Sequence, residues 1–262
     1  MRILVTNDDG IHGPGLEVLE EIAGQVSDDV WIVAPENEQS GASHSLTLHV
    51  PLRMRRIGER KFTVIGTPTD CVLLGVKHIL KDHRPDLVLS GVNRGANLAD
   101  DVTYSGTIAG AMEGTALGVP SIALSQAYSG TSPVQWDTAR RFGAPLVKHL
   151  LAGSWAKDVL LNVNFPPIAP DEVRGVRATV QGRRDQSAAV IDERTDLRGN
   201  RYYWIGFGRT EPETGEDSDL QAVIAGNISV SALHLNLTHQ AATDVLERVL
   251  APCAIRDGTF SV

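Results

Sequence analysis

The chain has 262 residues, and 24 Lys and Arg against 32 Asp and Glu give a formal net charge of −8 with histidine neutral. This acidic balance excludes a basic protein that coats nucleic acid, so we expect no nucleic-acid duplex as a partner. Hydrophobic residues make up 42% of the chain, which is ample for one large core and indicates a folded protein. Aromatic residues at 5% disfavour a single-strand binder that stacks on bases.

The cysteines and the apolar segments bear on the cellular compartment. Cys71 and Cys253 are too few for a disulfide framework or a thiolate zinc site, and we expect both to be buried small hydrophobic residues. The opening Met1-Arg2-Ile3-Leu4-Val5-Thr6 lacks the longer apolar run and the cleavage site of a signal peptide. No segment approaches the ~20 apolar residues of a membrane helix. We therefore expect a cytoplasmic protein with no membrane partner.

Short apolar runs bounded by turn residues recur through the first half of the chain. They are residues 3–5, 30–34, 62–65, 87–89 and 121–124, and they predict buried parallel strands. Helical spacing of apolar residues lies between several of them, at residues 16–26 and 72–80. A further helix at 136–151 and a strand at 159–163 complete the pattern. The alternation predicts an α/β fold with a Rossmann-like, doubly wound, mostly parallel sheet.

The pattern changes after Pro166-Pro167. Residues 176–182, a polar stretch and a turn at Gly199-Asn200 lead into the aromatic run 202–207, which predicts an extended β-arm. Such an arm packs either on another subunit or on its own core, and the residues leave both open. We expect 211–219 to be a solvated loop, 228–237 a strand and 241–250 a helix. The prediction is a single α/β domain with a core at 1–167 and a C-terminal β-arm and helix at 168–262.

Ligands of doubly wound sheets bind outside the carboxyl ends of the strands, so the residues that follow each run are the candidates for chemistry. The first strand leads into Asn7-Asp8-Asp9-Gly10. Two adjacent carboxylates can neutralise a divalent cation through hard oxygen ligands. The alternative is a turn in which an Asp or Asn caps the next helix.

Three more strand ends carry polar residues. The second strand enters a long polar loop that contains Ser40, a candidate hydroxyl ligand, and His44, for which the sequence offers no partner. The run Ser90 to Asn97 provides glycines for close backbone approach and amides, including Asn93, as neutral oxygen ligands. Ser105-Gly106-Thr107 precedes a helix of small residues, where free amides and hydroxyls suit a phosphate; the alternative is an ordinary N-cap.

These features converge on one predicted edge of the sheet. Two carboxylates, neutral oxygen donors and an anion-binding helix end, without a thiol nucleophile, indicate hydrolysis of a phosphoester by a metal-activated water. The sequence therefore predicts a metal-dependent phosphatase.

The same residues resemble the SurE survival-protein family of nucleotidases. The motifs that match in order and spacing are residues 3–11, Val33-Ala34-Pro35 to Ser40-Gly41, His44-Ser45, Gly66 to Cys71, Ser90 to Gly95 and Ser105-Gly106-Thr107. The second half matches more loosely, through residues 162–166 and the Tyr203-Trp204 arm.

The resemblance implies a phosphatase for nucleoside 5′-monophosphates and often 3′-monophosphates, with polyphosphate as a substrate in some members. It implies Mg²⁺ or Mn²⁺ held by Asp8, Asp9, Ser40 and Asn93, with Asp8 also orienting or activating the attacking water. It implies a phosphate site lined by Asn97, Ser105, Gly106 and Thr107, and a dimer or tetramer that exchanges the C-terminal arm. For Gly66 to Cys71 we expect a structural role, with Asp70 capping the following helix.

Two other functions are compatible with parts of the pattern. A haloacid-dehalogenase-type phosphatase needs two Asp separated by one residue after a strand, whereas Asp8 and Asp9 are adjacent and Asp217-Ser218-Asp219 follows no apolar strand. A non-catalytic nucleotide sensor could use the same fold and the same helix end, but it has less need for the acidic pair.

Overall fold

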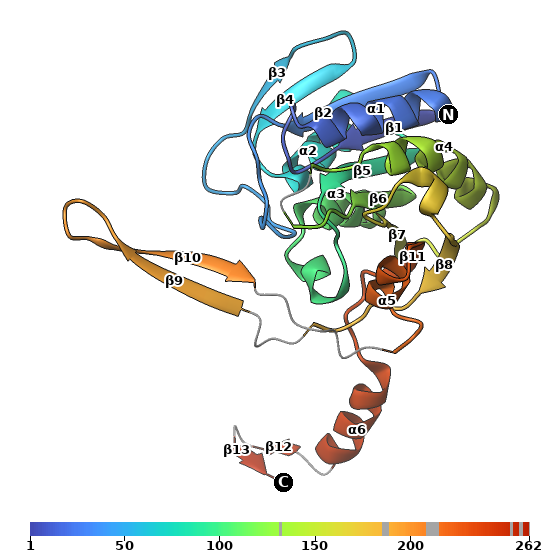
Figure 1. Cartoon of the computed structure of the whole chain (residues 1–262). Helices are drawn as coiled ribbons and strands as arrows, with labels where there is room; N and C mark the ends of the chain where they lie inside the picture. Colours follow the sequence, from blue (N-terminus) through green and yellow to red (C-terminus); the bar gives the residue numbers. More distant parts are fainter. Residues whose placement is uncertain (131–132, 185–188, 208–214, 252–253, 257–258, 262) are drawn as a thin grey trace.

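In the computed structural model of the chain, nine strands form one sheet in the order β3-β4-β2-β1-β5-β6-β7-β11-β8 (Figure 1). The structure describes residues 1–130, 133–184, 189–207, 215–251, 254–256 and 259–261, so the prediction for Cys253 lies outside the described residues. The strands are β1 Arg2–Thr6, β2 Asp29–Pro35, β3 Arg53–Arg56, β4 Lys61–Ile65, β5 Leu87–Arg94, β6 Ser121–Gln126, β7 Val159–Phe165, β8 Gly175–Thr179 and β11 Asn227–His234.

Helices cover both faces of this sheet. The helices of the described residues are α1 Pro14–Val26, α2 Pro68–Leu74 with a π-helical extension Gly75–Ile79, a 3₁₀ helix Ala99–Thr103, α3 Gly106–Ala116, α4 Asp137–Ala152, a 3₁₀ helix Pro170–Glu172, α5 Asp219–Ile224 and α6 Gln240–Leu250, and all but α6 lie in the main body. Successive residues of β1 point to opposite faces: Ile3 packs in the core under α1 and α4, and Leu4 packs in the core under α2. This arrangement confirms the predicted doubly wound α/β fold.

The parallel strands change direction of winding between β1 and β5. The connection from β1 through α1 leads to β2 on one side, and the connection from β5 through α3 leads to β6 on the other. The carboxyl ends of β1 and β5 therefore meet at a topological switch point, the place at which open α/β sheets bind ligands, and we refer to this place as the crevice. All the strongest candidates for chemistry lie on or beside these two ends.

The second half of the chain extends the same sheet. Strand β11 pairs antiparallel with β7 and parallel with β8, so strands beyond residue 167 belong to the main body. The division at residue 167 stays a prediction. The expected solvated loop at 211–219 is wrong at its end, because Ser218 and Asp219 are buried at the start of α5; residues 211–214 lie outside the described residues.

The later part of the predicted β-arm is a hairpin of β9 Ala189–Thr195 and β10 Arg201–Phe207, which pair with each other and project away from the sheet (Figure 1). The earlier part, predicted at residues 176–182, is wrong, because residues 176–179 belong to β8 and pair with β11 in the main sheet. The side chains of the hairpin at residues 190–206 are exposed, and Trp204 keeps 61% of its surface accessible. The alternative of a hairpin folded on its own core is therefore wrong. Helix α6 also lies outside the body, and a short hairpin of β12 Ala254–Arg256 and β13 Thr259–Ser261 follows it.

Two smaller predictions concern Cys71 and membrane-spanning helices. Cys71 is fully buried in the core under α2, as expected. Within the described part of the chain, no helix is both long and apolar enough to cross a membrane.

Candidate active site

Asp8 and Asp9 follow β1 directly and lie at the crevice. Asp8 is 4% exposed, and Asp9 is half-buried. The turn after them is closed by Asn7, whose side-chain amide donates to the carbonyl of Gly10 at 2.9 Å. The N-cap of α1 is Gly13, without a side-chain hydrogen bond, so neither carboxylate serves as a helix cap. The capping alternative is therefore wrong, and both carboxylates remain available for chemistry.

The N-terminus of α3 lies against Asp8. The hydroxyl of Thr107 donates to Oδ1 of Asp8 at 2.5 Å. A side chain at Gly106 would bring its Cβ to 2.8 Å from Cβ of Asp8 and to 3.0 Å from Oδ2, so only glycine allows this approach. Ser105 is the N-cap of α3, because its Oγ accepts the amide of Ile108 at 3.0 Å. The capping interpretation of Ser105 is confirmed, and its hydroxyl proton is still free to be donated to a ligand.

The end of β5 approaches Asp9. The backbone amide of Arg94 donates to Oδ2 of Asp9 at 3.1 Å. The neighbouring Asn93 is half-buried and uses its amide nitrogen to bind the carbonyl of Gly95 at 3.0 Å, which leaves its amide oxygen as an acceptor. Gly91 makes this course of the strand possible: its φ is +130°, and a Cβ would lie 2.1 Å from the carbonyl oxygen of Leu124.

The polar loop after β2 touches the site through its backbone. The amide of Gln39 donates to the carbonyl of Asp8 at 2.7 Å. The hydroxyl of Ser40 donates to Glu38 at 2.9 Å, and no hydrogen bond joins it to Asp8 or Asp9 in the described residues. The structure gives His44 the partner that the sequence did not reveal, because its Nε2 lies 2.9 Å from Oε2 of Glu113 on α3.

Asp70 has a structural role, as expected, although the helix begins at Pro68 and its N-cap is Thr67. Asp70 is the third residue of α2 and forms a capping box with Thr67. Both carboxylate oxygens of Asp70 also accept from Thr47, the backbone amide at 3.0 Å and the hydroxyl at 2.6 Å. Asp70 thereby ties the far end of the polar loop to α2.

Asn97 is an anchor of the loop that follows β5. Its side-chain nitrogen donates to Oγ of Ser125 at 2.8 Å, and its backbone amide donates to Oδ1 of Asn164 at 2.8 Å. The carbonyl of Asn97 accepts from the side chains of Asn162 and Asn164. The structure thus places Asn97 near the site but shows its side chain bound within the protein; its predicted contact with substrate stays a prediction.

The electrostatics of the acidic pair call for a cation. Burial raises the pKa of Asp8 to about 6, and the charge of Asp9 acts in the same direction. Burial and the charge of Glu38 also raise the pKa of Asp9, against the opposing effect of Arg94. No Lys or Arg side chain forms an ion pair with either carboxylate in the described part of the chain. An external cation would relieve this uncompensated charge.

The donor set decides which cation fits. Among the described residues, no group of three or more His, Cys, Asp and Glu is arranged to hold a metal ion. Beside the two carboxylates, the oxygens at the ends of β1 and β5 are neutral, those of Asn93 and of the backbone, and the part of Ser40 as a ligand stays a prediction. Oxygen ligands without nitrogen or sulfur suit a hard divalent cation such as Mg²⁺ or Mn²⁺.

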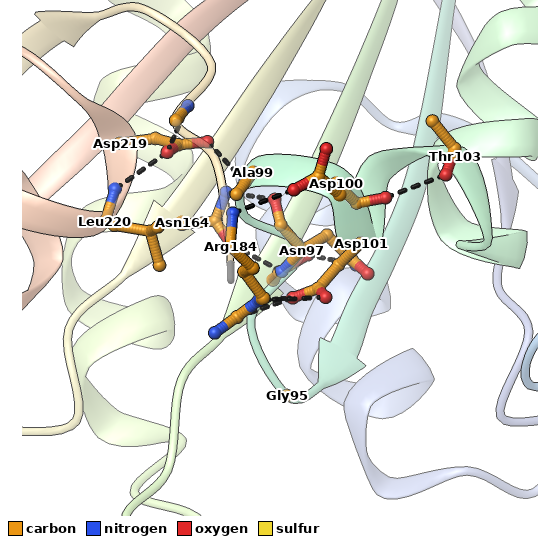
Figure 2. A network of polar contacts seen from close by, with 12 residues as sticks. Gly95, Asn97, Ala99, Asp100, Asp101, Thr103, Asn164, Arg184, Asp219 and Leu220 are labelled. Carbon is orange, nitrogen blue, oxygen red and sulfur yellow. Dashed lines mark hydrogen bonds and ion pairs between the residues drawn. The ribbon is translucent and has the colours of Figure 1, made fainter. Parts of the chain in front are cut away.

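Sequence reasoning missed Asp219 and Arg184, which bind the loop between β5 and α3 (Figure 2). Asp219 is fully buried and accepts backbone amides, so this Asp of the Asp-x-Asp at 217–219 has a structural role. A signal was present: Ser218 and Asp219 precede the apolar residues of a short helix, as N-caps do.

Comparisons with known proteins identify the family of the chain. The model of the family described as "Survival protein SurE" matches residues 3–188. A protein of Parvibaculum lavamentivorans named 5'-nucleotidase SurE is 56% identical over 256 residues, which cover 97% of this chain and 92% of that protein. A protein of Methylobacterium radiotolerans with the same name is 58% identical over 242 residues, which cover 92% of this chain and 95% of that protein.

A solved structure shares the fold. The crystal structure of the SurE protein from Aquifex aeolicus superposes with a TM-score of 0.81 at 39% sequence identity, covering 95% of this chain and 99% of the other. The similarity therefore includes the second half of the chain as well as the strand ends of the first.

Proposed function

This chain belongs to the SurE survival-protein family, and on that premise we propose that it is a 5′-nucleotidase, a phosphatase that hydrolyses nucleoside 5′-monophosphates to nucleoside and phosphate. The observation that carries the proposal is the contact of Asp8 with the N-terminus of α3. It brings a buried carboxylate and a phosphate-binding helix end within hydrogen-bond distance of each other. An enzyme that cleaves a phosphoester at a metal site needs both groups at one place.

The helix end supplies the phosphate site in this proposal. The first amides of α3 have no partner within the helix, and its dipole favours an anion. The hydroxyl of Ser105 and the backbone amide of Thr107 add donors, and the missing side chain of Gly106 lets the phosphate approach the backbone. Asn97 would hold the far side of this site from its anchored loop.

Asp8, Asp9, Ser40 and Asn93 are the residues that would hold the divalent cation, Mg²⁺ or Mn²⁺. The buried, uncompensated carboxylates fit this role, as does the free amide oxygen of Asn93. A bound cation supplies Lewis-acid chemistry, neutralising charge on the phosphoryl oxygens and acidifying the attacking water. For Ser40 to take part, its hydroxyl would have to leave Glu38.

Asp8 has a second task in the proposal, which is to orient the attacking water and accept its proton. The hydroxyl of Thr107 fixes one carboxylate oxygen of Asp8, so the direction of the other is defined.

The proposal extends to nucleoside 3′-monophosphates and short polyphosphate as further substrates, and to self-association through the β9–β10 hairpin. A two-stranded hairpin with exposed aromatic residues is marginally stable alone and gains from a second surface. A homodimer or a homotetramer would provide that surface.

The test is phosphate release from a panel of 5′- and 3′-nucleoside monophosphates and short polyphosphate, with Mn²⁺, with Mg²⁺ and with EDTA. We expect release from the 5′-monophosphates with a metal and none with EDTA. Nucleotide binding without release by the folded protein would favour the sensor. A covalent aspartyl phosphate trapped during turnover would favour the dehalogenase-type reaction.

A further inference from the structure

The loop at residues 95–105 joins the two halves of the site. It begins after Asn93 and Arg94 at the end of β5 and ends at Ser105, the N-cap of α3. Within it, Ala99 has a φ of +53°, in the left-handed region that residues with a Cβ adopt at a cost. Contacts from outside the loop must therefore hold it in this shape.

These contacts come from the second half of the chain. Three consecutive loop residues each bind it: the carbonyl of Ala99 accepts from Nε2 of Gln181 at 3.0 Å, Oδ2 of Asp100 accepts the backbone amide of Arg184 at 2.8 Å, and Asp101 binds the Arg184 guanidinium. Figure 2 shows Arg184 lying along Asp100 and Asp101, with Asp219 on the other side of Ala99. Asp219 accepts the amides of Ala99 and Gly182, both at 2.9 Å.

Arg184 is connected to the phosphate-binding helix end through a single residue. Its Nε lies 3.0 Å from both carboxylate oxygens of Asp101, and its Nη2 lies 2.6 Å from Oδ2. The carbonyl of the same Asp101 accepts the backbone amide of Ser105 at 3.1 Å. A displacement of Asp101 therefore moves the N-cap of α3.

Charge gives Arg184 a second effect at this place. Asp100 and Asp101 are two carboxylates just before a helix end that is to bind an anion, and uncompensated they would repel it. The guanidinium neutralises Asp101 with the fork geometry that a carboxylate matches and that an ammonium group lacks. The side chains of Arg184 and Asp101 are 38% and 33% exposed, so solvent screens part of this effect.

We propose that Arg184 is a positioning residue of the active site, which holds Asp101 and thereby sets the N-terminus of α3 for phosphate binding. The inference rests on the proposed function and adds a residue from outside the predicted site. Arg184 touches neither Asp8 nor the helix end, and it acts on the substrate only through Asp101.

The experiment compares Arg184→Gln, Arg184→Lys and the matched control Arg183→Gln, which removes an adjacent, exposed positive charge. The readouts are kcat and KM for a nucleoside 5′-monophosphate and the inhibition constant of inorganic phosphate. For Arg184→Gln we expect both KM and the phosphate inhibition constant to rise about five- to tenfold, with kcat within about twofold. Arg184→Lys should be intermediate, and Arg183→Gln should match the unaltered chain. A loss confined to kcat, with KM and phosphate inhibition unchanged, would mean a merely structural role and would overturn the inference.

A second readout does not depend on turnover. Hydrogen exchange at the amides of residues 97–105 should speed up about tenfold in Arg184→Gln and stay unchanged in Arg183→Gln. If the unaltered chain releases no phosphate, the proposed function fails, while faster exchange in Arg184→Gln still supports the view that Arg184 holds the loop through Asp101. If the unaltered chain is active and Arg184→Gln changes neither exchange nor KM, the positioning role of Arg184 is wrong and the proposed function stands.

Discussion

The crevice at the ends of β1 and β5 and the β9–β10 hairpin break the usual rule of burial in opposite ways. At the crevice, ionisable Asp8 is buried with no cationic side chain bonded to it, among the described residues. Along the hairpin, Trp204 and its apolar neighbours are exposed. A buried charge without a counter-ion and an exposed apolar strip are both costly for a chain on its own.

The two regions therefore need different kinds of partner. The crevice requires positive charge and accepts an anion beside it, so a metal ion and a phosphate fit. The hairpin requires apolar surface, so another protein surface fits. Substitutions in the two regions test this contrast.

The largest effect should come from removing a carboxylate of the crevice. We expect Asp8→Asn and Asp9→Asn each to lower kcat/KM roughly 1000-fold, about 4 kcal/mol, because the cation loses a charged ligand. The far-ultraviolet circular dichroism spectrum should be unchanged, since neither residue packs in the core. An activity equal to that of the unaltered chain would refute the assignment of the acidic pair.

The substitution Asp8→Asn should also stabilise the metal-free protein. The raised pKa of Asp8, about 6 against 3.8, means that the folded state binds this proton more tightly than the unfolded state. The free energy of unfolding therefore falls as pH rises from about 4 to about 6, by on the order of 3 kcal/mol for this group.

Urea titrations at several pH values test this sign. Relative to Asp8→Asn, the metal-free chain should lose stability as pH rises through that window and regain it on addition of Mn²⁺ at pH 7.5. If the stability difference between the two proteins does not change with pH, burial does not raise the pKa of Asp8 and this account of the carboxylate is wrong.

The next largest effect should come from adding a methyl group at the N-terminus of α3. We expect Gly106→Ala to lower kcat/KM by about 30-fold, roughly 2 kcal/mol, because its Cβ would press on Asp8. Gly24→Ala is the matched control, since Gly24 lies in α1 with nothing within 4 Å of the added carbon. Equal steady-state kinetics for the two variants would contradict the close approach of α3 to Asp8.

A smaller effect is expected for the N-cap. Ser105→Ala should raise KM about fivefold, near 1 kcal/mol, because one donor is lost while the neighbouring amides remain. The variant should also melt at a slightly lower temperature. If Ser105→Ala loses more activity than Asp9→Asn in the same assay, the roles that we assign to Ser105 and Asp9 are wrong.

The smallest effect on folding should come from the hairpin. Trp204→Ser should change the free energy of unfolding by less than about 0.5 kcal/mol, because the side chain is exposed. Sedimentation should instead show weaker self-association. An unchanged mass distribution, together with a large loss of stability, would mean that Trp204 packs within its own chain.

The elements that the sequence predicted best are those with uniform surroundings. Buried parallel strands such as β1 and β6 have apolar residues on both faces, so their runs are continuous. The edge strand β3, with the sequence Arg-Met-Arg-Arg, has no such run and was missed. Helix α5 was missed because six residues are too few to show a helical period.

The candidate site divides in the same way. Asp8, Asp9, Gly106 and Thr107 could be brought together from sequence, because the topology of a doubly wound sheet sets where strand ends meet. The ion pair of Arg184 with Asp101 could not be predicted from the sequence. These residues are 83 positions apart, both in polar segments whose pattern is typical of any exposed loop.

The loop between β5 and α3 also constrains when the site can exist. Ala99 is held by Asp219, 120 positions further along the chain. At about 5–20 residues per second of synthesis, roughly 6 to 24 seconds separate the appearance of the two. During that interval the ribosome carries a chain with both aspartates and the helix end already made, but with their connecting loop still unanchored. A nascent chain that stops before residue 219 would therefore have every residue of the candidate centre and lack the means to assemble it.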